Sequence, residues 1–135
     1  MNQRGMTLIE IIVVIVLISL VFGIVAQGVF GRGEAAKAQL NEVKMQNLQN
    51  SIEQYRFSFN SYPSKLDELL QPSAEVKKSG KLFVSLAKDE DLKDVWNNPL
   101  GYRTENNNRT YALTSLGSDG VEGGEGPKQD VTKRP

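Results

Sequence analysis

The chain has 135 residues, 16 basic and 16 acidic side chains, a net charge of zero, and neither cysteine nor histidine. Without cysteine there is no disulfide framework, thiol nucleophile or thiolate metal site, and without histidine the commonest acid–base residue is missing, so we expect no enzyme. Because no block of lysine and arginine supplies the positive surface that phosphate backbones require, we also expect no nucleic-acid partner.

The apolar residues are concentrated near the N-terminus, where residues 6–30 include a single charged side chain, Glu10. The segment Met6–Ala26 would extend about 30 Å as a helix, which matches the hydrocarbon thickness of a bilayer. Its many isoleucines and valines would favour a strand in water, but an open strand in lipid leaves backbone groups unpaired. We therefore predict a membrane-spanning helix, followed by enough chain for one small domain.

A secretory signal peptide and a plain single-pass anchor are the alternatives for this segment. The apolar run exceeds the roughly 7–15 residues of a signal peptide, and Ile24-Val25-Ala26 is a mediocre cleavage site. A plain anchor leaves Glu10 unexplained, since a carboxylate in apolar surroundings costs several kcal/mol unless it is neutralised or paired. Cleavage after Gly5 would place a new α-amine on Met6, one helical turn from Glu10, where it could pair with that carboxylate or with a neighbour's.

The N-terminal sequence Arg4-Gly5-Met6-Thr7-Leu8-Ile9-Glu10, followed by an Ile/Val/Leu run, resembles the class III leader of type IV pilins and type II secretion pseudopilins. The resemblance implies that a prepilin peptidase removes residues 1–5 by cutting after Gly5 and then methylates Met6. The apolar helix over residues 6–30 would stay in the mature protein, and Glu10 would pair subunits during assembly. The family usually has phenylalanine where this chain has Met6.

Beyond residue 30, an amphipathic pattern predicts that the helix continues over residues 31–60 and ends at about Phe59. Its predicted apolar stripe consists of Leu40, Val43, Leu48, Ile52, Tyr55 and Phe59. Residues 61–135 would form a small globular head. Within it, residues 71–93 are interpreted as a variable loop, with Leu82-Phe83-Val84 as a candidate buried anchor.

In the second half of the head the sequence predicts a β-hairpin, because Gly101–Glu105 and Arg109–Leu116 flank three asparagines that tolerate left-handed turns. A three-stranded antiparallel sheet laid on the long helix would give an α+β fold of the type IV pilin-like kind. The preceding segment Asp94–Tyr102 resembles the Asp-Pro-Trp-Gly-Asn-Pro-Tyr segment of major pseudopilins, and Trp96 is expected to fill the core.

The segment from Leu116 to Asp130 combines closely spaced glycines with acidic side chains. Composition alone favours a solvated flexible tail, although glycine also lets a backbone curl tightly enough to present oxygen ligands to calcium. The segment resembles the calcium loop of major pseudopilins. The resemblance implies that calcium is bound by the carbonyl of Leu116, by Asp119 and by a later carboxylate, for which Asp130 and Glu125 compete.

The resemblance as a whole implies a structural subunit of the type II secretion pseudopilus that polymerises through its N-terminal helix and drives export across the outer membrane. The implied partners are further copies of the chain, minor pseudopilins, the prepilin peptidase, and the inner-membrane secretion platform with its ATPase. The implied location is the inner membrane, crossed once, with the head in the periplasm. The alternatives are a type IV pilin, major or minor, and a membrane-anchored calcium-binding domain that never polymerises.

Overall fold

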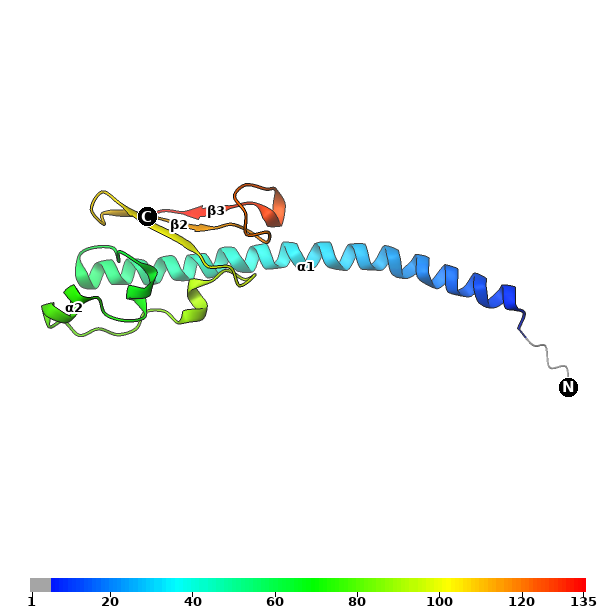
Figure 1. Cartoon of the computed structure of the whole chain (residues 1–135), viewed down its shortest axis with the longest axis horizontal. Helices are drawn as coiled ribbons and strands as arrows, with labels where there is room; N and C mark the ends of the chain where they lie inside the picture. Colours follow the sequence, from blue (N-terminus) through cyan, green and yellow to red (C-terminus); the bar gives the residue numbers. More distant parts are fainter. Residues whose placement is uncertain (1–5) are drawn as a thin grey trace. The chain divides into compact units, whose positions relative to one another are not determined.

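The computed structural model describes residues 6–135, apart from the side chains at positions 27 and 29–31. Within this range the chain forms two α-helices, α1 (Leu8–Phe59) and α2 (Ala74–Ser79), and three strands, β1 (Gly101–Glu105), β2 (Thr110–Ser115) and β3 (Val131–Lys133). Three short 3₁₀ helices complete it: η1 (Leu66–Leu69), η2 (Asp89–Leu92) and η3 (Gly126–Lys128). The chain divides into two compact units, one as far as Glu34 and the other over Ala35–Pro135 (Figure 1).

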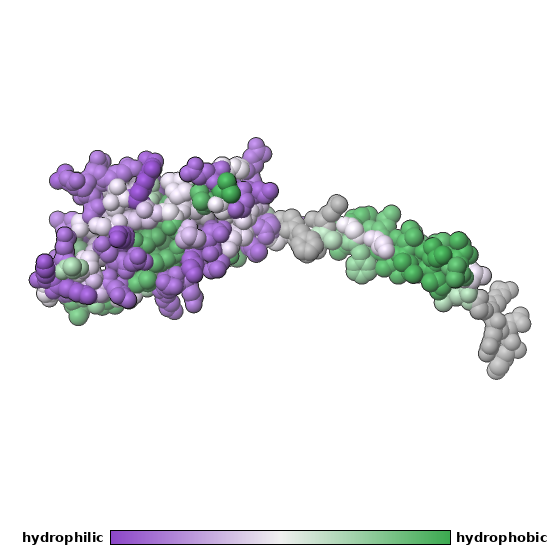
Figure 2. Space-filling model, viewed as in Figure 1, coloured by the Kyte–Doolittle hydropathy of each residue, from purple (hydrophilic) through white to green (hydrophobic). Residues whose placement is uncertain are grey.

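The first unit consists, in its described part, of the start of α1. The segment Leu8–Ala26 is long and apolar enough to cross a membrane, and no part of it is buried against the other described residues. Figure 2 shows the hydrophobic residues gathered over this unit, whereas the second unit is mostly hydrophilic outside. Among the described residues nothing covers this apolar window, which therefore needs lipid or another protein as its partner.

The second unit is a three-stranded antiparallel sheet packed on the later part of α1, and it confirms the predicted α+β architecture. The strand order is β1-β2-β3, with Gly101 opposite Thr114 and Ser115 opposite Val131. Asn106, Asn107 and Asn108 all have positive φ, which is the conformation expected at this hairpin. The predicted end of the helix at Phe59 is also confirmed.

The buried stripe of α1 differs from the predicted one. Leu40 and Val43 are 62% and 59% exposed, and the buried positions are Asn41, Met45, Leu48, Ile52 and Tyr55. These five recur at steps of four and three, so they follow one face of the helix, while Leu40 and Val43 lie on another. The prediction was wrong there because it favoured apolar residues over an asparagine. The buried stripe contacts Tyr111 and Leu113 of β2 in a single core.

The region after η1 is more ordered than a variable loop. The helix α2 is capped at its N-terminus by Ser73, whose side chain accepts a hydrogen bond from the Val76 amide (3.3 Å), and at its C-terminus by Gly80, which has φ of 68°. The predicted anchor was largely wrong, since Leu82 is 88% exposed and only Phe83 turns inward. Trp96 is half-buried and is not a member of the buried core either.

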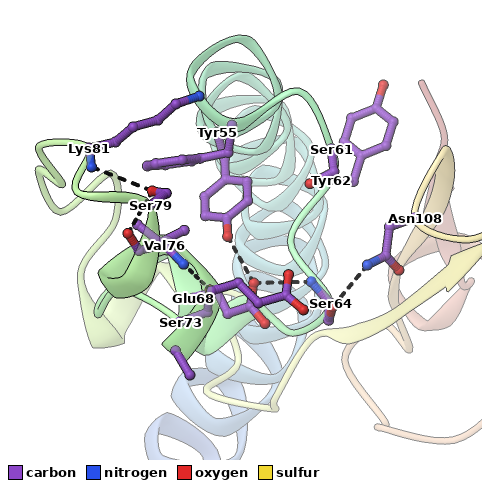
Figure 3. A pocket seen from close by; sticks show the side chains of 13 residues that line it. Tyr55, Ser61, Tyr62, Ser64, Glu68, Ser73, Val76, Ser79, Lys81 and Asn108 are labelled. Carbon is purple, nitrogen blue, oxygen red and sulfur yellow. Dashed lines mark hydrogen bonds between the residues drawn. The ribbon is translucent and has the colours of Figure 1, made fainter.

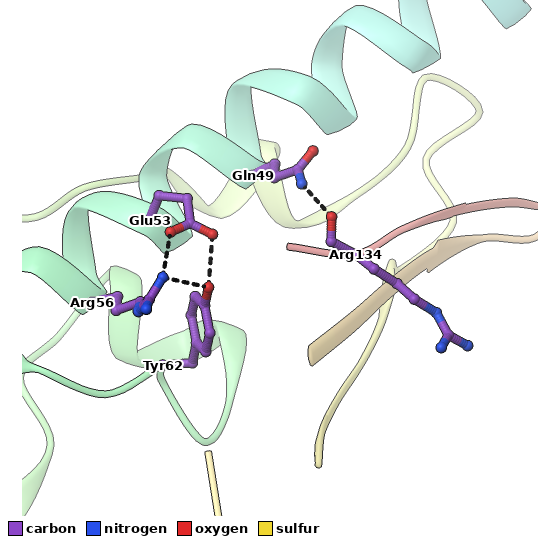
Figure 4. Close-up of polar contacts among 5 residues, drawn as sticks. All are labelled: Gln49, Glu53, Arg56, Tyr62 and Arg134. Atoms are coloured by element: carbon purple, nitrogen blue, oxygen red, sulfur yellow. Dashed lines mark hydrogen bonds and ion pairs between the residues drawn. The ribbon is translucent and has the colours of Figure 1, made fainter. Parts of the chain in front are cut away.

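Tyrosines and charged side chains fasten the end of α1 to the chain that follows it. The Tyr62 hydroxyl donates to Glu53 (2.9 Å), and Arg56 donates to the Tyr62 hydroxyl (3.2 Å) (Figure 4). Gln49 donates to the backbone carbonyl of Arg134 (2.7 Å), which holds the chain after β3 against the helix. Near the same end of α1, the buried Tyr55 donates to Glu68 (3.0 Å) (Figure 3).

The Tyr55–Glu68 contact predicts a pH dependence of stability. Burial, followed by the hydrogen bond to Glu68, raises the pKa of Tyr55 to about 12, whereas the phenol of an unfolded chain titrates near pH 10. The stabilisation is fully present below pH 10 and is lost as the pH rises towards 12, because the folded state must hold a proton that the unfolded state releases.

For the full-length chain in detergent, the stability advantage of wild type over Tyr55→Phe should shrink between pH 10 and 12, by no more than about 1.4 kcal/mol per pH unit. Chemical unfolding at several pH values measures this difference. Parallel curves for the two proteins across that range would contradict the assignment.

Candidate functional site

The first candidate site is the start of α1, where Thr7 and Glu10 lie close together. The Thr7 hydroxyl accepts a hydrogen bond from the Glu10 amide (3.4 Å), and the Thr7 carbonyl accepts from Ile11 (3.3 Å). Thr7 thus caps the helix, with Glu10 in its first turn near the positive end of the helix dipole. This role of Thr7 was not predicted from the sequence, although Thr-x-x-Glu before an apolar run is a known signal for a helix start.

The carboxylate of Glu10 is exposed and has no basic neighbour along its helix. The next basic residue of α1 is Arg32, about 33 Å further along the helix axis. Met6 precedes Glu10 by about one turn and is 70% exposed. The predicted cleavage residue Gly5 lies outside the described residues. A positive group for Glu10 therefore has to come from the region of Met6 or from another molecule.

The second candidate site is the acidic glycine-rich loop between β2 and β3. Because Ser115 pairs with Val131, the sheet brings the two ends of the loop, Leu116 and Asp130, next to each other. The loop is closed further by a hydrogen bond from the Ser118 amide to the Pro127 carbonyl (3.0 Å) and by η3. It is therefore a folded loop.

Two glycines are required for this folded loop. At Gly117, with φ of 72°, a Cβ atom would lie 2.7 Å from the Lys128 carbonyl. At Gly124, with φ of 96°, it would lie 2.6 Å from the same oxygen. No L-residue fits at either position without moving the backbone. The glycines allow the two limbs of the loop to approach closely.

The acidic side chains of the loop have different surroundings. Asp119 Oδ1 accepts from the Val121 amide (3.1 Å), and Asp130 Oδ2 accepts from the Gly123 amide (3.0 Å). The other oxygen of Asp130 is buried and has no hydrogen-bond partner among the described residues. Glu125 is exposed at the start of η3, where its side chain makes no capping hydrogen bond.

These surroundings fit a hard cation with few carboxylate ligands. A buried carboxylate oxygen without a hydrogen bond is costly, and a bound cation would compensate it. Among the described residues no group of three or more acidic side chains is gathered as a metal site. Backbone carbonyls such as that of Leu116 would have to supply several ligands, which calcium accepts. On this geometry Asp130 suits the later carboxylate better than Glu125.

Comparison with known proteins agrees with the class that the fold defines, a pilin-like α+β protein with an exposed apolar N-terminal helix. Residues 1–26 match the prokaryotic N-terminal methylation motif. Residues 28–134 match the family described as type II secretion system (T2SS), protein G. The chain therefore belongs to the protein G family of the type II secretion system, the major pseudopilins, whose role in secretion is structural.

Similar proteins with the name type II secretion system core protein G occur in several bacteria. The protein of Xanthomonas campestris pv. campestris is 38% identical over 131 residues, which cover 96% of this chain and 89% of that protein. The Pseudomonas aeruginosa protein is 32% identical over 136 residues, with 96% and 94% covered, and the Vibrio cholerae protein 29% over 137 residues, with 96% and 90% covered. The resemblance to pseudopilins is thus confirmed.

The loop geometry predicts different outcomes for two glycine substitutions. Gly117→Ala should lower the free energy of unfolding by at least about 2 kcal/mol, because it adds a backbone clash to an unfavourable φ. Gly80→Ala is the matched control, since Gly80 has φ of 68° with open space around its Cβ position, and it should cost about 1 kcal/mol. Denaturant unfolding of the full-length chain in detergent measures both, and equal losses would show that Gly117 does not hold the loop limbs together.

Proposed function

We propose that this chain polymerises through α1 into the pseudopilus of a type II secretion system and thereby drives protein export across the outer membrane. The observation that carries the proposal is the wholly exposed apolar span that begins with one carboxylate, in a chain of the protein G family. Repetition of one heterologous contact without closure produces a filament. The family match favours the pseudopilus over the pilus of a type IV pilin.

Assembly on this proposal depends on Glu10. Cleavage by a prepilin peptidase after Gly5 frees the amine of Met6, which is then methylated, and the match to the methylation motif supports this step. The methylated amine remains a cation and lies close in sequence to the carboxylate. A bundle of these helices excludes water, so each Glu10 pairs with an amine of its own or of an adjacent subunit.

The proposed location is the inner membrane, which Leu8–Ala26 crosses once, with the second unit in the periplasm. There the chain meets minor pseudopilins, and the inner-membrane platform with its ATPase adds subunits to the filament. The support for these partners is membership of the family, since a subunit of this system has to be inserted, processed and extracted from the membrane by other components.

We assign no catalytic chemistry to the chain. The cavity beside the end of α1, about 400 Å³ in volume, is lined by several serines (Figure 3). The Ser73 hydroxyl accepts from the Val76 amide, the Ser79 hydroxyl donates to the Val76 carbonyl, and that of Ser64 accepts from Asn108. These hydroxyls make structural contacts, and no histidine is available as their base.

Calcium is the proposed ligand of the loop between β2 and β3. The carbonyl of Leu116 and the carboxylates of Asp119 and Asp130 would hold the ion, which would neutralise the loop and join its two ends. The support is the buried, unbonded oxygen of Asp130 at the base of a folded loop. In a chain without cysteine, such an ion would serve as a crosslink.

The assembly proposal predicts that Glu10→Ala abolishes filaments and blocks secretion while the protein still enters the membrane. Loss of one member of a buried charged pair weakens binding by about 2–5 kcal/mol, and this loss would be repeated at every subunit contact. Electron microscopy of filaments and assay of an exported substrate measure the effect. Ser19→Ala is the matched control within the span and should change neither, because the Ser19 hydroxyl donates to the Ile15 carbonyl of its own helix. Normal filaments and secretion from Glu10→Ala would refute the role of Glu10 in assembly, whereas a wild type that forms no filaments would favour the membrane-anchored domain that never polymerises.

The calcium proposal predicts that saturating calcium raises the melting temperature of the full-length chain in detergent by about 10 °C relative to chelator. Asp119→Asn and Asp130→Asn should remove most of this shift, and Glu122→Gln, an exposed acid of the same loop, should keep it. If Glu125→Gln removes the shift and Asp130→Asn does not, the later ligand is Glu125. Melting curves of the wild type that are identical with calcium and chelator would refute the site.

A further inference from the structure

Three buried polar side chains meet where α1, the loop after η2 and the end of β2 come together. Asn41 is 1% exposed, Asp94 3% and Ser115 0%. The Asn41 amide donates to the Ser115 hydroxyl (3.0 Å), and that hydroxyl donates to Asp94 Oδ2 (3.2 Å). Burial of three such groups is costly unless each is hydrogen-bonded, and their contacts to one another satisfy that need.

The carboxylate of Asp94 also organises the turn that follows it. Its Oδ1 atom accepts from the backbone amides of Trp96 (3.0 Å) and Asn98 (2.8 Å). The Val95 amide in turn donates to Asn41 Oδ1 (3.4 Å). Both carboxylate oxygens of Asp94 are therefore occupied by donors from the turn and from β2, so the turn is held at a fixed position against α1.

The same cluster reaches the peptide groups at the start of the acidic loop. The Ser115 hydroxyl accepts from the Gly117 amide (3.5 Å), and that N–H belongs to the peptide unit that carries the Leu116 carbonyl. A peptide unit is planar, so fixing its N–H also fixes the direction of its carbonyl. The Asn98 side chain donates to the Gly117 carbonyl (3.4 Å) and so holds the next peptide unit.

We infer that Asn41, Asp94, Ser115 and Asn98 are positioning residues for the cation site. The first three orient the Leu116 carbonyl from beneath the loop, and Asn98 holds the peptide unit that follows it. The inference rests on the proposed calcium site. None of the four touches the ion on this account; the ligand they orient is a backbone carbonyl, which no side-chain substitution can remove. Groups that orient metal ligands set affinity because they reduce the ordering that binding requires. The calcium affinity of the loop is thus coupled to a side chain of α1 that lies 74 positions before Ser115.

Calcium titration calorimetry of the full-length chain in detergent, combined with melting in chelator, tests the inference. Asn41→Ala should weaken calcium binding about tenfold, as expected for loss of a group that orients a ligand. Asn47→Ala is the matched control, an exposed amide on the same helix, and should bind as wild type does. Asn98→Ala, at a half-buried position, should also weaken binding and provides a second variant if Asn41→Ala does not fold.

The possible outcomes distinguish failure of the positioning role from failure of the calcium site itself. If the wild type, Asn41→Ala and Asn98→Ala all bind calcium with equal affinity, the inference is overturned and the calcium site remains. If the variants then also melt at a lower temperature than the wild type in chelator, the cluster is purely structural. If Asn41→Ala fails to fold and Asn98→Ala binds as wild type does, the inference is overturned too. A wild type that binds no calcium overturns both the site and the inference.

Discussion

One carboxylate at the start of an apolar helix is the constraint on which the account depends. No described part of the chain covers Leu8–Ala26, so lipid or other subunits must cover it. Glu10 belongs to that helix and has no basic residue within reach along it. Lipid can cover the apolar side chains, but it offers the carboxylate little, whereas a bundle of processed chains supplies both apolar cover and a cation. On the proposed function, an assembly is therefore the environment in which the apolar part of α1 is most stable.

The second unit is built so that α1 also supports the loop. One face of the helix packs against β2 in the hydrophobic core. The first buried position on that face is Asn41, a polar residue that belongs to the cluster beneath the loop. The loop itself is ordered by glycines that let its limbs touch and by the pairing of β2 with β3. A cation at its base would complete an arrangement in which the helix, the turn at Asp94 and the C-terminal strand are held together.

Much of the fold followed from local sequence, and the errors have a common cause. The end of α1 at Phe59 and the hairpin around Asn106–Asn108 were predictable because turn chemistry and helix periodicity are local. The stripe was misplaced at Leu40 and Val43, since burial of Asn41 depends on Ser115, which is distant in sequence. The leader motif singled out Glu10, whose role in assembly stays a prediction. For the loop, composition alone favoured a flexible tail, because the close approach of Gly117 to Lys128 and the buried oxygen of Asp130 arise only when β2 and β3 pair.

The most direct test of the central claim is the mass of the chain extracted from the membranes of a bacterium that contains a prepilin peptidase. The pairing of Glu10 requires a free cation at Met6. We expect a chain that starts at Met6 and carries one additional methyl group, with residues 1–5 removed. A chain that still begins at Met1, in cells where the secretion system is active, would contradict it, because Glu10 would then have no amine at its own depth to pair with.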